Sequence, residues 1–265
     1  MNRTTTLAAW VLFAATIYLI FADAVKPWLL LPQFGDIGFT LVFVLFALAH
    51  CIAFEGLRRT GIFFAISAVV SFLMEETGVR TGLIYGAYHY SDMLGAKLGH
   101  VPVIIPLAWF MMIYPSWMVA RALLRGVDTN SIPGITALAT IAAFVMTAWD
   151  VVMDPGMARA GNWVWENGGA YFGVPRRNYL GWLATTFIVY WIVAWFWRGA
   201  GHRRGATKLF AALPVLVYAV YALRYLTPNR IPALQVVALF AMVVPGLLAL
   251  IQLAMKRNTE LAAGS

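Results

Sequence analysis

Eight apolar runs, each close to the length needed to cross a lipid bilayer, dominate this sequence. A membrane-spanning helix needs about 20 apolar residues, and lipid forces the backbone to satisfy its own polar groups. We therefore predict an all-α fold, a polytopic integral membrane helical bundle of about eight transmembrane helices, forming a single transmembrane domain over residues 1–265. The runs cover residues 7–25, 37–54, 60–74, 102–120, 135–153, 179–197, 208–225 and 232–255.

The charge distribution fits a membrane protein better than a nucleic-acid-binding one, although the net charge is +8. Lys and Arg gather in cytoplasmic loops, and the side that carries both termini holds 11 of the 19 basic residues but three of the 11 acids. We expect a multi-pass protein of the cell membrane with cytoplasmic N- and C-termini, the lipid bilayer as a partner and no nucleic acid. We expect the tail at 256–265 to be disordered. A cleaved signal peptide ending near FADA (21–24) is the alternative for the first run, which is long for one.

Two long loops rich in Gly and aromatic residues follow the third and fifth runs. Such loops suit a position folded back on the bundle, where protein covers their backbone. Both hairpins share an order of features: an acid followed two residues later by Gly, a loop, a Val-Pro pair, and a Trp seven residues after the Pro. We interpret this as a weak internal repeat of two helical hairpins, with chance similarity as the alternative. The matched residues are Glu76, Gly78, Val101, Pro102 and Trp109, and Asp154, Gly156, Val174, Pro175 and Trp182.

Four acidic residues lie where apolar sequence gives way to these loops. Asp150 and Asp154 are one helical turn apart and therefore share a helix face. Glu75 and Glu76 are adjacent, about 100° apart on a helix, so only one of them can face the core. A carboxylate near membrane depth is costly unless it is paired or neutralised, and it indicates a functional site. The alternative is that arginines of the loops pair with these acids and only hold the structure.

The chemistry available is that of carboxyl, amide and aromatic groups. The sequence has no HExxH motif, no GxGxxG after a strand and no P-loop, so we expect no metal and no cofactor. A carboxyl group buried in apolar surroundings favours its protonated form and can donate a proton to a weak base. A trisubstituted alkene is such a base, and aromatic faces stabilise the resulting tertiary cation. Capture by water gives an alcohol, and capture by a second double bond closes a ring.

Four blocks, in order, resemble the membrane-embedded carotenoid hydratase family (CruF type), which includes gamma-carotene hydratase and bisanhydrobacterioruberin hydratase. They are FLMEETGVRTGLIYGAYHYSDMLG, VPVIIPLAWFMMIYPSW, WDVVMDPGMARAGNWVW and YFGVPRRNYLGW, within residues 70–200, the expected catalytic core. The resemblance implies a cofactor-independent hydro-lyase of carotenoid biosynthesis in a microbial cell membrane. It implies addition of water to the terminal ψ-end double bond of an acyclic or monocyclic carotenoid, with other carotenoid-pathway membrane enzymes as further partners.

Our hypothesis is that one acid protonates the alkene and a partner orients water. Asp154 and Glu76 are favoured, because the Gly two residues after each would let a loop approach. Asn178 is expected to bind the water or the product hydroxyl. The catalytic candidates are Asp154, Glu76, Asp150, Glu75 and Asn178, and the expected substrate-binding residues are Tyr85, Tyr88, Trp109, Trp149, Trp163, Trp165 and Trp182.

Three other functions fit parts of the pattern. A lycopene-type carotenoid cyclase begins with the same protonation. A membrane prenyltransferase would use D-x-x-x-D to bind Mg²⁺, but it needs a second acid-rich motif, and the first hairpin offers Glu-Glu. A proton-coupled transporter would use the carboxyl groups as a relay, although no span carries a polar stripe for a hydrophilic substrate.

Overall fold

The protein is an all-α membrane helical bundle, which confirms the predicted fold class. The computed structural model describes residues 2–198, 207–227 and 231–255, so the tail at 256–265 lies outside the described residues. In these ranges, seven helical segments are long and apolar enough to cross a membrane. The segment α7, with 17 residues, is not among the seven.

Each apolar run of the sequence corresponds to one helical segment. The third and fifth segments extend beyond their apolar runs, so that all four candidate acids lie on helices rather than in loops. The segments are α1 (Arg3–Val25), α2 (Gly35–Glu55), α3 (Leu57–Thr81), α4 (Ile104–Leu123), α5 (Ile132–Arg159), α6 (Arg176–Trp197), α7 (Lys208–Arg224), and a last one made of α8 (Pro232–Ala238), the π-helical turn η2 (Leu239–Val243) and α9 (Val244–Ala254).

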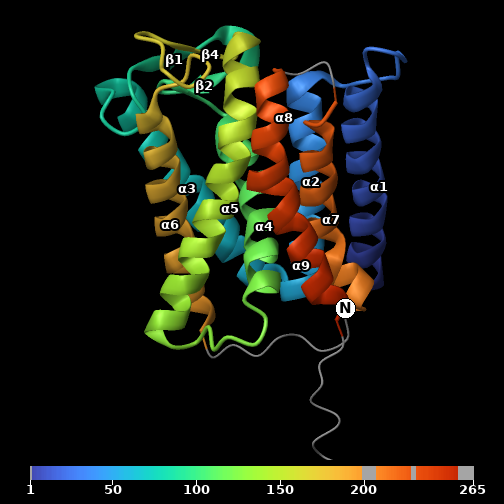
Figure 1. Cartoon of the computed structure of the whole chain (residues 1–265). Helices are drawn as coiled ribbons and strands as arrows, with labels where there is room; N and C mark the ends of the chain where they lie inside the picture. Colours follow the sequence, from blue (N-terminus) through green and yellow to red (C-terminus); the bar gives the residue numbers. More distant parts are fainter. Residues whose placement is uncertain (1, 199–206, 228–230, 256–265) are drawn as a thin grey trace, which may run out of the picture.

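Helix α4 lies at the centre of the bundle. It packs against α2, α3, α5, α7 and α9, and most of its side chains are buried. Figure 1 shows the beginning of α1 and the end of α9 at one end of the bundle, and the two long loops at the other. The two described chain ends therefore lie on one side, as an even number of crossings requires. That this side is the cytoplasm stays a prediction.

The two long loops meet through a short antiparallel strand pair, which we call the β1–β4 ribbon. Strand β1 (Tyr88–Tyr90) belongs to the loop after α3, and β4 (Trp163–Trp165) belongs to the loop after α5. Tyr88 lies opposite Trp165, and Tyr90 opposite Trp163. The first loop also contains a 3-10 turn (η1, Asp92–Leu94) and the hairpin of β2 (Lys97–Leu98) and β3 (Val101–Pro102). Both loops thus fold back on the bundle, as predicted.

The matched tryptophans of the two hairpins contact each other. The rings of Trp109 and Trp182 stack with their centroids 4.1 Å apart and their planes 16° apart. This contact is what two similar hairpins facing each other would produce, and it supports the proposed repeat.

The glycines of the proposed repeat differ in their surroundings. A Cβ added at Gly78 would lie 2.6 Å from the ring of Tyr85, so this glycine does let a loop approach its helix. Nothing lies within 4 Å of a Cβ added at Gly156, so the same expectation for Gly156 is wrong. Gly181 of α6 lies against the other side of the Tyr85 ring, and a Cβ added there would be 2.5 Å from the ring.

We predict that Gly181→Ala destabilises the protein by roughly 1–3 kcal/mol, the usual cost of overpacking a core. The added methyl group would overlap the Tyr85 ring and the carbonyl oxygen of Ile84, which cannot move without shifting the loop. Thermal unfolding of the protein in detergent measures the change. Gly156→Ala is the matched control and should be neutral or stabilising, since its methyl group meets nothing. Equal melting temperatures for the two variants would contradict the packing described here.

Candidate active site

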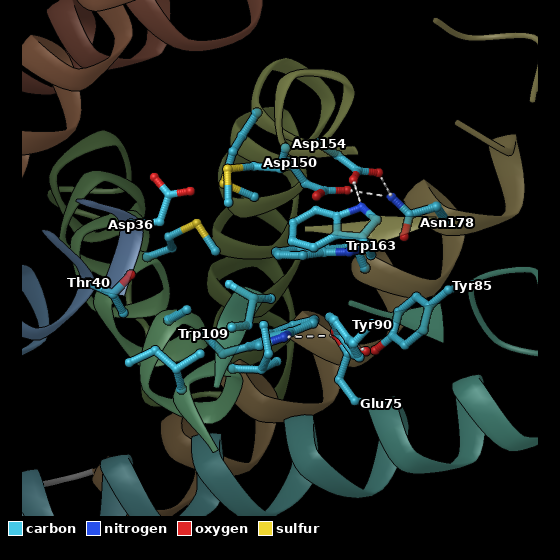
Figure 2. Close-up of a pocket in the computed structure, with 18 of the residues that line it drawn as sticks. Asp36, Thr40, Glu75, Tyr85, Tyr90, Trp109, Asp150, Asp154, Trp163 and Asn178 are labelled. Carbon is cyan, nitrogen blue, oxygen red and sulfur yellow. Dashed lines mark hydrogen bonds between the residues drawn. The ribbon is translucent and has the colours of Figure 1, made fainter. Parts of the chain in front are cut away.

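A cavity lies beneath the β1–β4 ribbon, between the ends of α2, α3, α4, α5 and α6. Most of its wall is apolar or aromatic, and its polar groups converge from two sides (Figure 2). Pockets of this character, mostly apolar with a few converging polar groups, bind apolar small molecules. The lining residues include Asp36, Thr40, Glu75, Tyr85, Tyr88, Tyr90, Ile105, Trp109, Met111, Met112, Asp150, Met153, Asp154, Met157, Trp163, Trp165, Asn178 and Trp182.

One acidic centre is the pair Asp150 and Asp154 on α5, both within 1% of complete burial. The Asn178 side-chain amide, on α6, donates to Asp150 Oδ2 at 2.9 Å and to Asp154 Oδ2 at 2.8 Å. The indole N–H of Trp163 donates to Asp154 Oδ1 at 2.5 Å. The two carboxyl groups therefore share one donor, as their spacing of one helical turn allows.

The second acidic centre is Glu75 on α3, which is 3% exposed. Its Oε2 accepts hydrogen bonds from the hydroxyls of Tyr88 and Tyr90, the latter at 2.8 Å, and its Oε1 accepts the indole N–H of Trp109 at 3.0 Å. All three donors are uncharged. Burial raises the pKa of both tyrosines well above the usual range, and the nearby Glu75 adds to the effect. Both hydroxyls therefore stay protonated and able to donate at neutral pH.

The β1–β4 ribbon connects the two acidic centres. Tyr88 and Tyr90 alternate with an exposed residue, so both point from β1 to Glu75, and Trp163 of β4 reaches Asp154. Cross-strand contacts hold this arrangement: the ring of Tyr88 lies 4.9 Å from that of Trp165, and Tyr90 lies edge-on to Trp163 at 6.1 Å. A change in the ribbon would therefore alter the surroundings of both acids.

Within the described ranges, the acids of the two acidic centres are not paired with cationic side chains. Among the described residues, no ion pair involves Glu75, Asp150 or Asp154, and their partners are Tyr, Trp and Asn side chains. Asp150 Oδ1 is buried and has no hydrogen-bond partner in the described part of the chain. A buried carboxyl oxygen without a partner is costly and calls for an explanation. It is the one carboxyl oxygen of the aspartate pair that has no partner among the described residues.

Glu76, which the sequence favoured as an acid, does not line this cavity. It turns away from it to accept hydrogen bonds from the His100 backbone N–H at 2.8 Å and ring Nδ1 at 2.9 Å, and it pairs with Arg80 at 3.2 Å. A Cβ added at Gly99 would overlap the Glu76 carboxylate, so the turn between β2 and β3 is built around it. Glu76 thus holds a turn in place, and Glu75 takes the inward direction.

Most of the expected aromatic residues do line the cavity, and one does not. Tyr85, Tyr88, Trp109, Trp163, Trp165 and Trp182 all contribute to the wall. Trp149 is fully buried in the bundle instead, against Phe43, Tyr218 and Tyr221. The cavity lies on the face of α5 that carries Asp150, Met153 and Asp154, whereas Trp149 points toward α2 and α7.

Sequence reasoning missed several lining residues. Tyr90 could have been found from the alternation Tyr88-His89-Tyr90, which places both tyrosines on one face of a strand. Asp36 and Thr40 on α2 carry no local signal, because only the packing of α2 beside α4 and α5 brings them to the cavity. Met153 and Met157 could have been found from helical spacing, which places both on the face of α5 that carries Asp150 and Asp154.

The chain is similar to proteins of carotenoid biosynthesis. A family model described as "Carotenoid biosynthesis protein" matches residues 35–254, most of the chain. A relative named "Bisanhydrobacterioruberin hydratase", from Haloarcula japonica, is 32% identical over 150 residues. That match covers 56% of this chain and 49% of the relative, about half its length. These matches confirm the resemblance carried by the four sequence blocks. No solved structure matches the chain.

We predict that Asn178→Leu lowers stability, because two buried carboxyl oxygens lose their shared donor. The expected cost is about 1–3 kcal/mol for each group left unsatisfied. Thermal unfolding followed by tryptophan fluorescence measures it. Asn178→Leu made in the double variant Asp150→Asn, Asp154→Asn should lower stability by less, since the acceptors of the Asn178 amide are then no longer carboxyl groups. An equal cost in both backgrounds would mean that Asn178 acts through packing alone.

Proposed function

The chain belongs to the carotenoid biosynthesis protein family, and from this premise we propose that it is a carotenoid hydratase. It adds water across the terminal ψ-end double bond of an acyclic or monocyclic carotenoid and forms a tertiary alcohol. The observation that carries the proposal is the buried, unpartnered Asp150 Oδ1 in an apolar cavity that is rich in aromatic rings. The name of the relative from Haloarcula japonica points to the same reaction.

Asp150 is the proton donor in this proposal. Asp154 accepts hydrogen bonds at both oxygens, and Asp150 accepts at Oδ2 alone. Two buried carboxyl groups within hydrogen-bond distance of one amide nitrogen repel each other when both are ionised, which favours a state in which one of them keeps its proton. The free Oδ1 of Asp150 is the position from which that proton can reach a substrate. Proton transfer from it forms a C–H bond at the less substituted carbon of the double bond.

The cation formed at the more substituted carbon is stabilised by two features of the cavity. Glu75, held by three uncharged donors, supplies a fixed carboxyl group, whose oxygens carry partial negative charge, on the other side of the cavity from the aspartate pair. The stacked rings of Trp109 and Trp182, and the rings of Tyr85 and Trp163, present aromatic faces in the same wall. Attraction between a cation and an aromatic face contributes about 2 kcal/mol or more where water is excluded.

Water completes the reaction by bonding through its oxygen to the cationic carbon. The protonated alcohol then releases one proton to the carboxyl groups of the cavity, which end with as many protons as they began with. The net change is the addition of one water molecule, with no oxidation or reduction. Asn178, bonded to both aspartates, positions the donor and is therefore assigned a positioning role.

Expression in a host that makes lycopene, gamma-carotene or a longer acyclic carotenoid tests the proposed reaction. Pigments are extracted and analysed by mass spectrometry. The proposal predicts products heavier by one or two water molecules, with the conjugated chromophore unchanged. Products of unchanged mass that contain a ring would identify a cyclase instead. Unchanged pigments in all three hosts would contradict both reactions.

Side-chain substitutions test the assigned acids in the same host. We predict that Asp150→Asn and Glu75→Gln each lower hydration by about 10²-fold or more, the usual contribution of a positioned acid or base. Glu76→Gln is the matched control, since it changes the neighbouring residue of the same helix outside the cavity, and it should keep hydration near the unmodified level. Similar rates for Glu75→Gln and Glu76→Gln would remove Glu75 from the mechanism.

A further inference from the structure

A second cavity adjoins the first at the same end of the bundle. It lies between α1, α2, α5 and α7, and we call it the vestibule. Its wall differs from that of the first cavity because it includes the cationic side chains of Lys26 and Arg224. The residues that line it are Leu19, Asp23, Lys26, Gln33, Phe34, Gly35, Asp36, Phe39, Thr40, Met111, Met153, Met157, Tyr221 and Arg224.

The two cavities share part of one wall. Asp36, Thr40, Met111, Met153 and Met157 line both of them. Asp36 is exposed at the beginning of α2, and Thr40 lies buried one turn further into the bundle. In Figure 2 these two residues lie on the opposite side of the cavity from Asn178 and Tyr85. The partition is thus made largely of methionines, whose unbranched side chains change rotamer readily.

The vestibule offers the polar partners that water requires. Arg224 forms an ion pair with Asp23 and lies over the ring of Tyr221 at 4.8 Å. The Gln33 amide donates to the Ala22 carbonyl at 3.2 Å. Water occupies sites that have enough room and two to four polar partners, and it avoids purely apolar ones. We therefore expect water in the vestibule as far as the shared wall.

We infer that the vestibule supplies the water that captures the substrate cation, by way of Thr40 and the methionine partition. This inference rests on the proposed hydration and adds a route to it. A reaction in an apolar cavity needs its second reactant to enter without opening the cavity to bulk solvent. A separate polar entrance beside Asp36 meets that need, and the carotenoid end group occupies the aromatic side near Asn178 and Tyr85. Thr40 and Met157 then determine how readily the cation meets water.

Cysteine labelling tests the route without relying on activity. The sequence has one cysteine, Cys51, which is buried and lines neither cavity, so the unmodified protein is a blank. Met153→Cys places a thiol in the shared wall, and its reaction with a small cationic methanethiosulfonate in detergent is followed by mass spectrometry. We expect Met153→Cys to react, and we expect added Thr40→Leu or Met157→Phe to slow it by roughly tenfold, which corresponds to an added barrier of about 1.4 kcal/mol.

Hydration is measured in parallel in the carotenoid-producing host with Thr40→Leu and Met157→Phe. Both should lower hydrate formation by a similar factor while the purified variants still bind the carotenoid, as judged by its absorption spectrum. Leu41→Phe is the matched control, because it adds bulk at the next residue of α2, which is exposed and lines neither cavity. It should leave both labelling and hydration unchanged.

Three results would overturn the inference. The first is an unchanged labelling rate of Met153→Cys when either Thr40→Leu or Met157→Phe is added. The second is slower labelling in these variants together with full hydrate formation. The third is that Leu41→Phe slows labelling and hydration as much as they do. A failure of the proposed function has a different signature, namely no hydrate from the unmodified chain. The labelling rates then still decide whether the vestibule opens to the cavity. Thr40→Leu and Met157→Phe lie on different helices, so the test still works if one of them misfolds. A Cys51 that stays unreactive shows that each variant is folded.

Discussion

The structure depends on how carboxyl groups are held inside an apolar helical bundle. Four acids line the cavity, and the side chains that bond to them are uncharged donors from tyrosine, tryptophan and asparagine. A charged partner would fix each acid as an ion pair, whereas uncharged donors leave each carboxyl group able to give or accept a proton. The β1–β4 ribbon supplies Tyr88, Tyr90 and Trp163 to this arrangement, so a strand pair of a few residues determines the chemistry of a largely helical protein.

Much of this could be predicted from the sequence, because the main signals are periodic or local. The apolar runs fix the helices, since lipid leaves the backbone no other solution. The spacing of Asp150 and Asp154 places both on one helix face, and the structure brings Asn178 between them. The four sequence blocks carry the family resemblance, and the matched tryptophans of the two hairpins stack on each other.

What could not be predicted depends on contacts between distant segments. Glu75 and Glu76 are adjacent, and only the placement of α3 against α4 decides that Glu75 turns inward while Glu76 holds the turn at His100. Trp149 stands beside Asp150 in the sequence but points into the core, because consecutive helical residues diverge by about 100°. The strand pairing between β1 and β4 joins residues more than seventy positions apart, and each strand alone is too short to give a pattern.

The two cavities suggest how one site can bring an apolar reactant and a polar reactant together. The aromatic cavity suits the end of a long apolar chain, and the vestibule suits water, with a partition of flexible methionines between them. Such a division would protect the cation until water reaches the correct carbon. It would also explain why the acids lie at one end of the bundle rather than at its centre.

The central claim is that Asp150 holds a proton in the resting protein. Infrared difference spectroscopy of the purified protein against Asp150→Asn measures this directly, through the carbonyl stretch of a protonated carboxyl group. The account predicts that the unmodified protein shows this band, that the band shifts in heavy water, and that it is lost in Asp150→Asn. A spectrum that instead loses only carboxylate bands on substitution would show that Asp150 is ionised, and it would contradict the account.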